Sequence, residues 1–128
     1  MDCLRIWMKL LKLPQTPLTF MPMLLTAEEI VQRLHTHCDR LRQEFKLQRI
    51  GLYGSYARNE ATAESDIDLA YQPMPDHVVG FHLLLDLEEF LGVVLETKNL
   101  DLVNLRYMHP IVKFEMEKEV RWVECITF

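Results

Sequence analysis

Two aspartates, at positions 66 and 68, have the type and spacing needed for metal chemistry. Asp66 and Asp68 lie in a stretch that alternates polar and apolar residues, which is typical of a β-strand. Residues two apart on a strand point to the same side, with backbones roughly 6.5 Å apart, so both carboxylates can approach the same divalent cations. The pattern therefore predicts that Asp66 and Asp68 bind Mg²⁺.

A third acidic residue, Asp101, lies between Leu100 and Leu102 in a later apolar stretch. We expect this stretch to form a strand beside the first one, with Asp101 facing away from its leucine neighbours. Asp101 would then be the third metal ligand, and it could also orient or deprotonate an acceptor hydroxyl. Two ions held in such a site lie roughly 3.5 to 4 Å apart and activate the attacking and the leaving oxygen. Taken alone, Asp101 is equally compatible with a strand-end residue that accepts hydrogen bonds from backbone amides.

Gly54 and Ser55 follow a short apolar run at 50–52, and ten residues separate the pair from Asp66. A glycine at a strand-to-helix turn allows unusual dihedral angles and a close backbone approach. The free amides at the start of the following helix, together with the Ser55 hydroxyl, can hold phosphate oxygens. We therefore expect Gly54 and Ser55 to bind the phosphates of a nucleoside triphosphate.

Arg58, in the same segment, is a candidate for a further phosphate contact. A solvated ion pair with Glu60 or Glu64 explains this arginine at least as well. Each feature is common on its own, because a Gly-Ser pair is usually a turn and Asp-x-Asp is usually a solvated strand edge. The combination is more specific, since the turn, the spacing, the strand register and the third acid must all agree.

The elements around these residues predict an α+β fold. Thr26 followed by Glu29 is a capping-box pattern at the start of an amphipathic helix over 27–45. The other elements that we expect are strands near 50–52, 66–71, 100–103 and 121–125, and helices from Gly54 through Ala61, over 79–94 and near 110–118. This order predicts a small mixed β-sheet packed against about four helices, in one domain over residues 26–128.

Residues 1–25 differ in composition from this domain, because they combine an apolar, basic stretch with three prolines. The apolar stretch is too short and too charged to span a membrane, and it lacks a signal-peptide cleavage pattern. An interfacial amphipathic helix is one interpretation. We favour a poorly ordered extension, or a translation start upstream of one at Met21 or Met23.

The charge and the cysteine content limit the classes of partner. The chain carries 19 Asp and Glu residues against 14 Lys and Arg, a formal net charge of -5. An acidic protein repels phosphate backbones, so we expect no direct binding of nucleic acid, and we expect no membrane partner. The three cysteines are widely spaced without a C-x-x-C pair, which suggests neither a disulfide framework nor a zinc site and favours a reducing cytoplasm.

The segment GSYARNEATAESDIDL, residues 54–69, resembles the signature of the DNA polymerase beta-like nucleotidyltransferase superfamily, in which G-S, ten residues and D-x-D follow one another. More closely, it resembles the small MNT-type proteins of bacteria and archaea that pair with HEPN-domain toxins. The similarity extends over residues 26–124, with Leu-Asp-Leu-Val at 100–103 matching the third acidic strand. One departure is Asn59, where such proteins often have glycine. Asparagine tolerates left-handed backbone, so we expect the turn to survive.

The resemblance implies a nucleotidyltransferase fold and a MgATP-dependent antitoxin. Such a protein transfers AMP to a tyrosine hydroxyl of its HEPN ribonuclease toxin and releases pyrophosphate. The resemblance assigns phosphate binding to Gly54 and Ser55, metal binding to Asp66 and Asp68, and the roles of third ligand and base to Asp101.

Two other functions remain compatible with the sequence. The chain could neutralise its partner by stoichiometric binding alone, with the aspartates as remnants, or it could modify a small-molecule hydroxyl. Larger relatives that modify RNA ends or aminoglycosides carry extra domains for those substrates, and 128 residues leave no room for one. An acceptor supplied by a protein partner therefore fits best.

Overall fold

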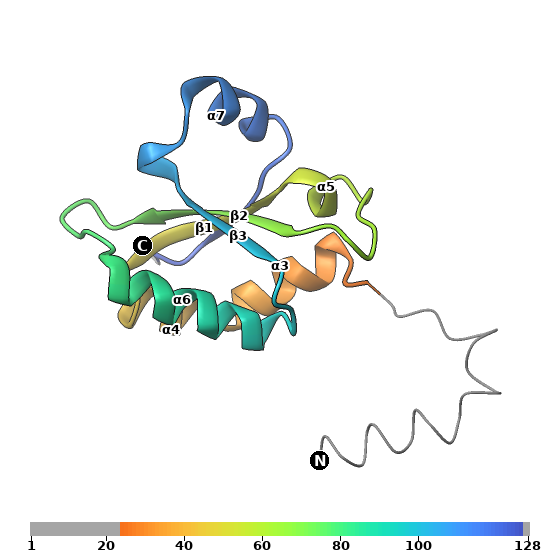
Figure 1. The fold of residues 1–128 in the computed structure, drawn as a ribbon. Coiled ribbons are helices and arrows are strands. Elements are labelled where there is room, and N and C mark those ends of the chain that lie inside the picture. Colours follow the sequence, from red (N-terminus) through yellow and green to blue (C-terminus); the bar gives the residue numbers. More distant parts are fainter. Residues whose placement is uncertain (1–23, 127–128) are drawn as a thin grey trace, which may run out of the picture.

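The computed structural model describes residues 24–126. The expectation for residues 1–25 lies outside this range, except that Leu24 and Leu25 are half-buried against the core. The centre of the fold is a four-stranded mixed sheet with the order β3-β2-β1-β4 (Figure 1). Its strands are β1 (Leu47–Tyr53), β2 (Ile67–Pro73), β3 (Leu100–Asn104) and β4 (Arg121–Glu124). β1 is antiparallel to β2 and to β4, whereas β2 and β3 are parallel.

Helices cover both faces of this sheet in the described part of the chain. They are α3 (Ala27–Thr36), α4 (Cys38–Gln43), α5 (Gly54–Ala57), α6 (Phe81–Val94) and α7 (Pro110–Glu117), with a 3-10 turn, η1, at Leu105–Tyr107. α3, α4 and α6 lie on one face, and α7 lies on the other (Figure 1). The expected α+β class and mixed sheet are confirmed.

The larger core lies between the sheet and the layer formed by α3, α4 and α6. Ile67 and Leu69 of β2 are 2% and 0% exposed, so the alternation predicted for this strand is correct and its aspartates face the other way. The helices contribute Ile30, Leu34, Leu41, Leu87 and Leu91, all fully buried. Burial of these side chains fixes the register of β2, because a slip by one residue would bring its polar face into the core.

A smaller apolar cluster fills the opposite face, under α7. Met116 of α7 and Met108 are buried against Ala70 of β2. Trp122 of β4 packs here over Gly51 of β1, where a Cβ would lie 2.6 Å from the indole. A glycine at this position leaves room for the tryptophan ring close to the backbone of β1.

The helix expected over 27–45 is wrong as a single element, because it is interrupted at His37. The backbone of His37 has φ -103° and ψ 17°, outside the helical region. Its ring nitrogen Nδ1 lies 2.8 Å from the carbonyl oxygen of Arg33, a carbonyl that the His37 amide also contacts at 3.3 Å. The side chain of His37 thus competes with the backbone amide for the same carbonyl oxygen, which weakens the helical hydrogen bond at this position.

The helix expected from Gly54 through Ala61 is shorter than predicted and ends at Ala57. Asn59 has φ 59°, a left-handed conformation that stops a helix. The expectation that asparagine supports the turn here is confirmed.

Two cysteines that are 87 positions apart in the sequence meet in the fold. The Sγ atoms of Cys38, in α4, and Cys125, after β4, lie 2.8 Å apart, and both residues are free thiols. Burial raises the pKa of Cys125, which keeps its thiol protonated. Among the described residues, no helix has the length and apolar character needed to cross a bilayer.

The central strand β2 should be sensitive to truncation of its buried side chains. We expect Leu69→Ala to lower the free energy of unfolding by about 2 to 5 kcal/mol, because it leaves a cavity in the larger core. Urea denaturation followed by circular dichroism measures this loss. Val78→Ala, at a side chain that is 74% exposed, is the control and should change stability by less than about 0.5 kcal/mol. If both substitutions lowered the free energy of unfolding equally, Leu69 would not belong to the buried core.

Candidate active site

The parallel pairing of β2 with β3 brings Asp68 and Asp101 together. The two residues are direct Cα partners in the register, so their side chains leave the sheet on the same face. Their carboxyl groups are close enough to share a hydrogen bond. Asp101 was expected on a neighbouring strand, facing away from its leucines, and the structure places it there.

Asp66 lies next to this pair, one residue before β2 begins. Its side chain is exposed, and its negative charge acts on Asp68. The amide of Ile67 donates to the carbonyl of Asn99 at 2.8 Å, which joins the starts of β2 and β3. Asp68 and Asp101 are thus paired where β2 and β3 begin, within reach of the charge of Asp66. These three aspartates are called the acidic group below.

Burial raises the pKa of Asp68 to about 6, and the negative charges of Asp101 and Asp66 add to this effect. The positive charge of Arg58 acts in the opposite direction. A carboxyl group that shares its site with two others resists ionisation unless a cation is present. Asp68 is thus the electrostatic centre of the acidic group.

Gly54 closes over the acidic group from the end of β1. It has φ 76°, a left-handed conformation that favours glycine, and a Cβ at this position would overlap a carboxylate oxygen of Asp68. The glycine is therefore needed both for the turn and for the close approach to Asp68. Ser55 follows at the start of α5, where the first amides of a helix have no carbonyl partner within the helix.

Sequence reasoning did not single out Glu119, which lies between α7 and β4. Its carboxylate accepts a hydrogen bond from the Gly54 amide at 2.5 Å and two from Nη1 of Arg58 at 2.9 Å. Arg58 also pairs with Glu60 at 3.0 Å, which is one of the ion pairs considered from the sequence. A separation of 61 positions between Arg58 and Glu119 leaves no local pattern by which the contact could have been found.

Tyr53, the last residue of β1, is a second group that the sequence did not indicate. It is the register partner of Asp68. Burial raises the pKa of Tyr53 to about 12, with further contributions from the charges of Asp68, Asp101 and Glu119. Its hydroxyl stays protonated and can act as a hydrogen-bond donor beside the carboxylates.

The acidic group suits a hard divalent cation in its chemistry. Carboxylate oxygens are the ligands that Mg²⁺ prefers, and a cation would relieve the repulsion that raises the pKa of Asp68. Within residues 24–126, no group of three or more His, Cys, Asp or Glu side chains is already arranged to hold a metal ion. The residues that could hold Mg²⁺ are Asp66, Asp68 and Asp101, with substrate oxygens and water completing the coordination.

Comparison with known proteins identifies the family of this chain. Residues 38–125 match the family model described as "Polymerase beta, Nucleotidyltransferase". The chain belongs to this nucleotidyltransferase family. The match includes the Gly54 turn and both strands that carry the aspartates.

The nucleotidyltransferase is similar to named relatives over more than half of its length. It is 35% identical over 102 residues to a putative protein adenylyltransferase of Methanocaldococcus jannaschii, covering 77% of this chain and 98% of the relative. It is 37% identical over 72 residues to the protein adenylyltransferase MntA of Thermococcus cleftensis, covering 56% of this chain and 71% of MntA.

Solved structures share the fold of this nucleotidyltransferase. A minimal nucleotidyltransferase, named as putative, superposes with a TM-score of 0.61 at 23% identity, covering 76% of this chain and 95% of that chain. A toxin-antitoxin complex with AMP-PNP gives a TM-score of 0.55 at 24% identity, covering 77% and 72%. A tri-AMPylated Shewanella oneidensis HEPN toxin in complex with MNT antitoxin gives 0.51 at 23% identity, covering 72% and 70%.

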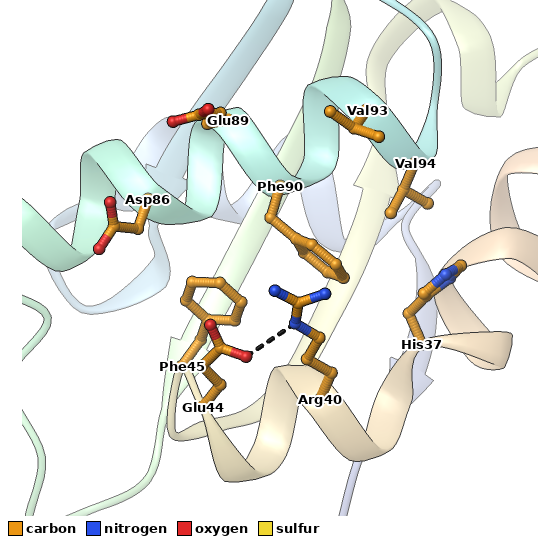
Figure 2. Close-up of a pocket in the computed structure, with 9 residues that line it drawn as sticks. All are labelled: His37, Arg40, Glu44, Phe45, Asp86, Glu89, Phe90, Val93 and Val94. Atoms are coloured by element: carbon orange, nitrogen blue, oxygen red, sulfur yellow. Dashed lines mark hydrogen bonds and ion pairs between the residues drawn. The ribbon is translucent and has the colours of Figure 1, made fainter.

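A separate hollow of about 610 Å³ lies between α4 and α6 (Figure 2). Arg40 reaches across it, 4.5 Å over the ring of Phe90, and pairs with Glu44 at 2.7 Å. Phe90 also stacks on Phe45, with ring centroids 5.4 Å apart. None of the residues that line this hollow belongs to the acidic group or to the Gly54 turn, so we assign it no part in the transfer.

Substitution of Gly54 should disturb the acidic group directly. We expect Gly54→Ala to lower nucleotidyl transfer by at least ~100-fold, because the added methyl group displaces the Asp68 carboxylate and strains the turn. Transfer from labelled ATP measures this loss. Gly80→Ala is the matched control, since nothing lies within 4 Å of a Cβ at that position. Full activity in Gly54→Ala would mean that the turn does not touch the reacting groups.

The raised pKa of Asp68 predicts a pH-dependent stability. The folded protein retains a proton, with a pKa of about 6, that the unfolded chain releases near 3.8, so stability falls as the pH rises from about 4 to about 6. Asp68→Asn removes the charge, and without metal at about pH 7.5 we expect it to be about 1 kcal/mol more stable than wild type. This figure is below the full linkage value because Asp68 is partly exposed.

Urea denaturation in EDTA across this pH range tests the expectation. The stability gain of Asp68→Asn should shrink as the pH is lowered through 6 towards about 4, and added Mg²⁺ should remove it by stabilising the wild type. Asp76→Asn, in the exposed loop after β2, is the control and should show a pH-independent difference. A gain in Asp68→Asn that is constant with pH would contradict the electrostatic origin.

Proposed function

We propose that this chain is a MgATP-dependent protein adenylyltransferase that acts as an antitoxin. It transfers AMP to a tyrosine hydroxyl of a HEPN-domain ribonuclease toxin and releases pyrophosphate. The observation that carries this proposal is the direct pairing of Asp68 with Asp101 beneath the Gly54 turn, in a chain of this nucleotidyltransferase family.

The names of the relatives support the substrate class. MntA of Thermococcus cleftensis is called a protein adenylyltransferase, and the relative from Methanocaldococcus jannaschii carries the same description as a putative activity. Two structures of the same fold are complexes of toxin and antitoxin, one with AMP-PNP and one with an AMPylated HEPN toxin. An acceptor hydroxyl on a HEPN toxin is therefore our proposal for this chain.

The residues of the site divide into three roles. Asp66, Asp68 and Asp101 would hold two Mg²⁺ ions, which lower the pKa of the attacking hydroxyl and neutralise charge on the leaving oxygen. Ser55, with the first amides of α5, would contact the phosphates of ATP. Asp101, which is more exposed than its pair partner Asp68, would accept the proton of the acceptor tyrosine.

In the proposed reaction, one bond to phosphorus forms, one breaks, and Asp101 takes up the proton that is released. The tyrosine oxygen forms a bond to the α-phosphorus of ATP, and the bond between this phosphorus and the oxygen that bridges to the β-phosphate breaks. The tyrosine proton passes to Asp101, and pyrophosphate leaves. Tyr53 can donate a hydrogen bond beside the carboxylates while this occurs, because its hydroxyl remains protonated.

The proposal also covers the compartment, the domain boundary and the contact with nucleic acid. We place the protein in the cytoplasm, with a domain that begins at residue 26, and we propose no direct contact with nucleic acid. The net charge of -5 supports the last point, because a long phosphate backbone would be repelled.

Neutralisation by binding alone is the second candidate function. It is favoured by the apolar side chains that η1 and α7 expose, since Tyr107, Ile111 and Phe114 are 73%, 69% and 63% exposed. Large exposed apolar side chains of this kind are found at protein-binding surfaces when they are contiguous. The two candidates differ in whether neutralisation needs the aspartates.

Mass spectrometry of the partner distinguishes the two functions. The chain is incubated with the product of its neighbouring gene, ATP and Mg²⁺, and we expect the partner to gain AMP. Asp66→Ala should reduce the rate of transfer by at least ~100-fold, because loss of one metal ligand removes several kcal/mol of transition-state stabilisation. Asp86→Ala, on the exposed side of α6, is the control and should retain transfer. If Asp68→Ala transfers no AMP yet still neutralises the toxin, binding is the function.

A further inference from the structure

We propose that Glu119 is a positioning residue for nucleotide binding, with Arg58 as its counterion. Its carboxylate fixes the Gly54 turn against the acidic group, and the phosphate contacts fall to Ser55 and the amides that follow it. This inference rests on the proposed function, because it concerns the site at which ATP would bind. It also changes the role expected for Arg58 from a phosphate ligand to a partner of Glu119.

The contacts of Glu119 join three separate segments. The Gly54 amide donates to its Oε2 atom at 2.5 Å, and Nη1 of Arg58 donates to both oxygens at 2.9 Å. Hydrogen bonds to an ionised acceptor are shorter and stronger than neutral ones. The Glu119 side chain is only 23% exposed, so solvent competes little for these bonds.

The backbone under Glu119 is well anchored. Its amide and that of Val120 both donate to the carbonyl of Met116, at 3.0 and 2.9 Å, and the Met116 side chain is 2% exposed. Val120 then leads directly into β4. The carboxylate therefore projects from a fixed connection between α7 and β4, which is what a group that positions another segment requires.

Glu119 and the aspartates hold the Gly54 turn from different directions. The Cβ direction of Gly54 points at Asp68, whereas its amide points at Glu119. The hollow of about 310 Å³ in which Glu119 lies is bordered by α7 and this turn, and neither Ser55 nor any of the three aspartates lines it. A nucleotide bound over the aspartates can thus reach Ser55 while the contact with Glu119 persists.

Arg58 makes this arrangement compatible with a triphosphate. An unpaired carboxylate beside the phosphates would repel them, and the two hydrogen bonds from Arg58 neutralise that charge. Removal of Arg58 alone should therefore be more harmful to nucleotide binding than removal of Arg58 and Glu119 together. A guanidinium that contacted the phosphates directly would give the opposite order.

A competing role for Glu119 predicts an effect of the opposite sign. A carboxylate that occupied the phosphate position would have to leave before ATP could bind. Its removal would then tighten nucleotide binding, whereas removal of a positioning residue weakens it. Affinity for the nucleotide therefore separates the two roles.

Calorimetric titration of the full chain with AMP-PNP and Mg²⁺ is the direct test. We expect Glu119→Ala to raise the dissociation constant about 10-fold, because the Gly54 amide loses its acceptor. Glu119→Gln keeps an acceptor at the same place and should remain within about 3-fold of wild type. Glu117→Ala, two residues earlier and exposed, is the matched control and should leave the affinity unchanged.

Kinetics of transfer give a second readout that a loss of stability alone would not produce. In Glu119→Ala the KM for ATP should rise about 10-fold while kcat changes less, and Glu119→Gln should restore the KM. If Glu119→Ala does not fold, as judged by its thermal melt, Glu119→Asp shortens the side chain by one methylene group. We expect this variant to weaken AMP-PNP binding, in contrast to Glu119→Gln.

AMP-PNP binding by wild type tests the proposed function, and binding by the Glu119 variants tests the positioning role. Wild type that binds no AMP-PNP would overturn the proposed function and the inference with it. Wild type that binds AMP-PNP, together with unchanged or tighter binding in Glu119→Ala, would overturn the positioning role alone. Weaker binding in Glu119→Ala that Glu119→Gln restores supports the role.

Discussion

Mutual repulsion among carboxylates at one end of β2 and β3 is the constraint on which the rest of this structure depends. Asp68 and Asp101 share a register, and the pKa of Asp68 rises to about 6 because burial and its acidic neighbours oppose its ionisation. The sheet withstands this cost because the opposite face of β2 is fully buried: Leu69, on that face, is 0% exposed and fixes the register. Apolar packing on one side of a strand thus holds an unfavourable charge arrangement on the other, and perturbed pKa values of this kind cluster at functional sites.

Local sequence patterns predicted most of the fold because strands and helices bury apolar side chains at a regular spacing along the chain. Alternation in β2 and β3 placed the aspartates on one face, and the positions of all four strands followed from apolar runs and turn residues. The break at His37 was missed because a side chain that competes for its own helix carbonyl is compatible with an uninterrupted apolar stripe. The helix after Gly54 was predicted too long because Asn59, already expected to tolerate a left-handed backbone, ends it before Ala61.

Contacts between segments that are far apart in the sequence could not be predicted from such local patterns. Glu119 meets Gly54 and Arg58 across more than 60 positions, and Cys38 meets Cys125 across 87. Nothing in the residue type of Glu119 separates it from the other glutamates of the α7 segment, since all of them suit a solvated helix. Only the packing of α7 across the smaller apolar cluster gives this one side chain its place beside the Gly54 turn.

The two faces of the sheet differ in how much apolar packing covers them. The larger core, under α3, α4 and α6, determines the strand register that the aspartates require, whereas α7 rests on a small cluster and turns much of its apolar surface outwards. Substitutions on the outer surface of α7 alter few buried contacts, and their cost in stability is correspondingly small. The surface of α7 can therefore vary in sequence while the strands that carry the aspartates keep their arrangement.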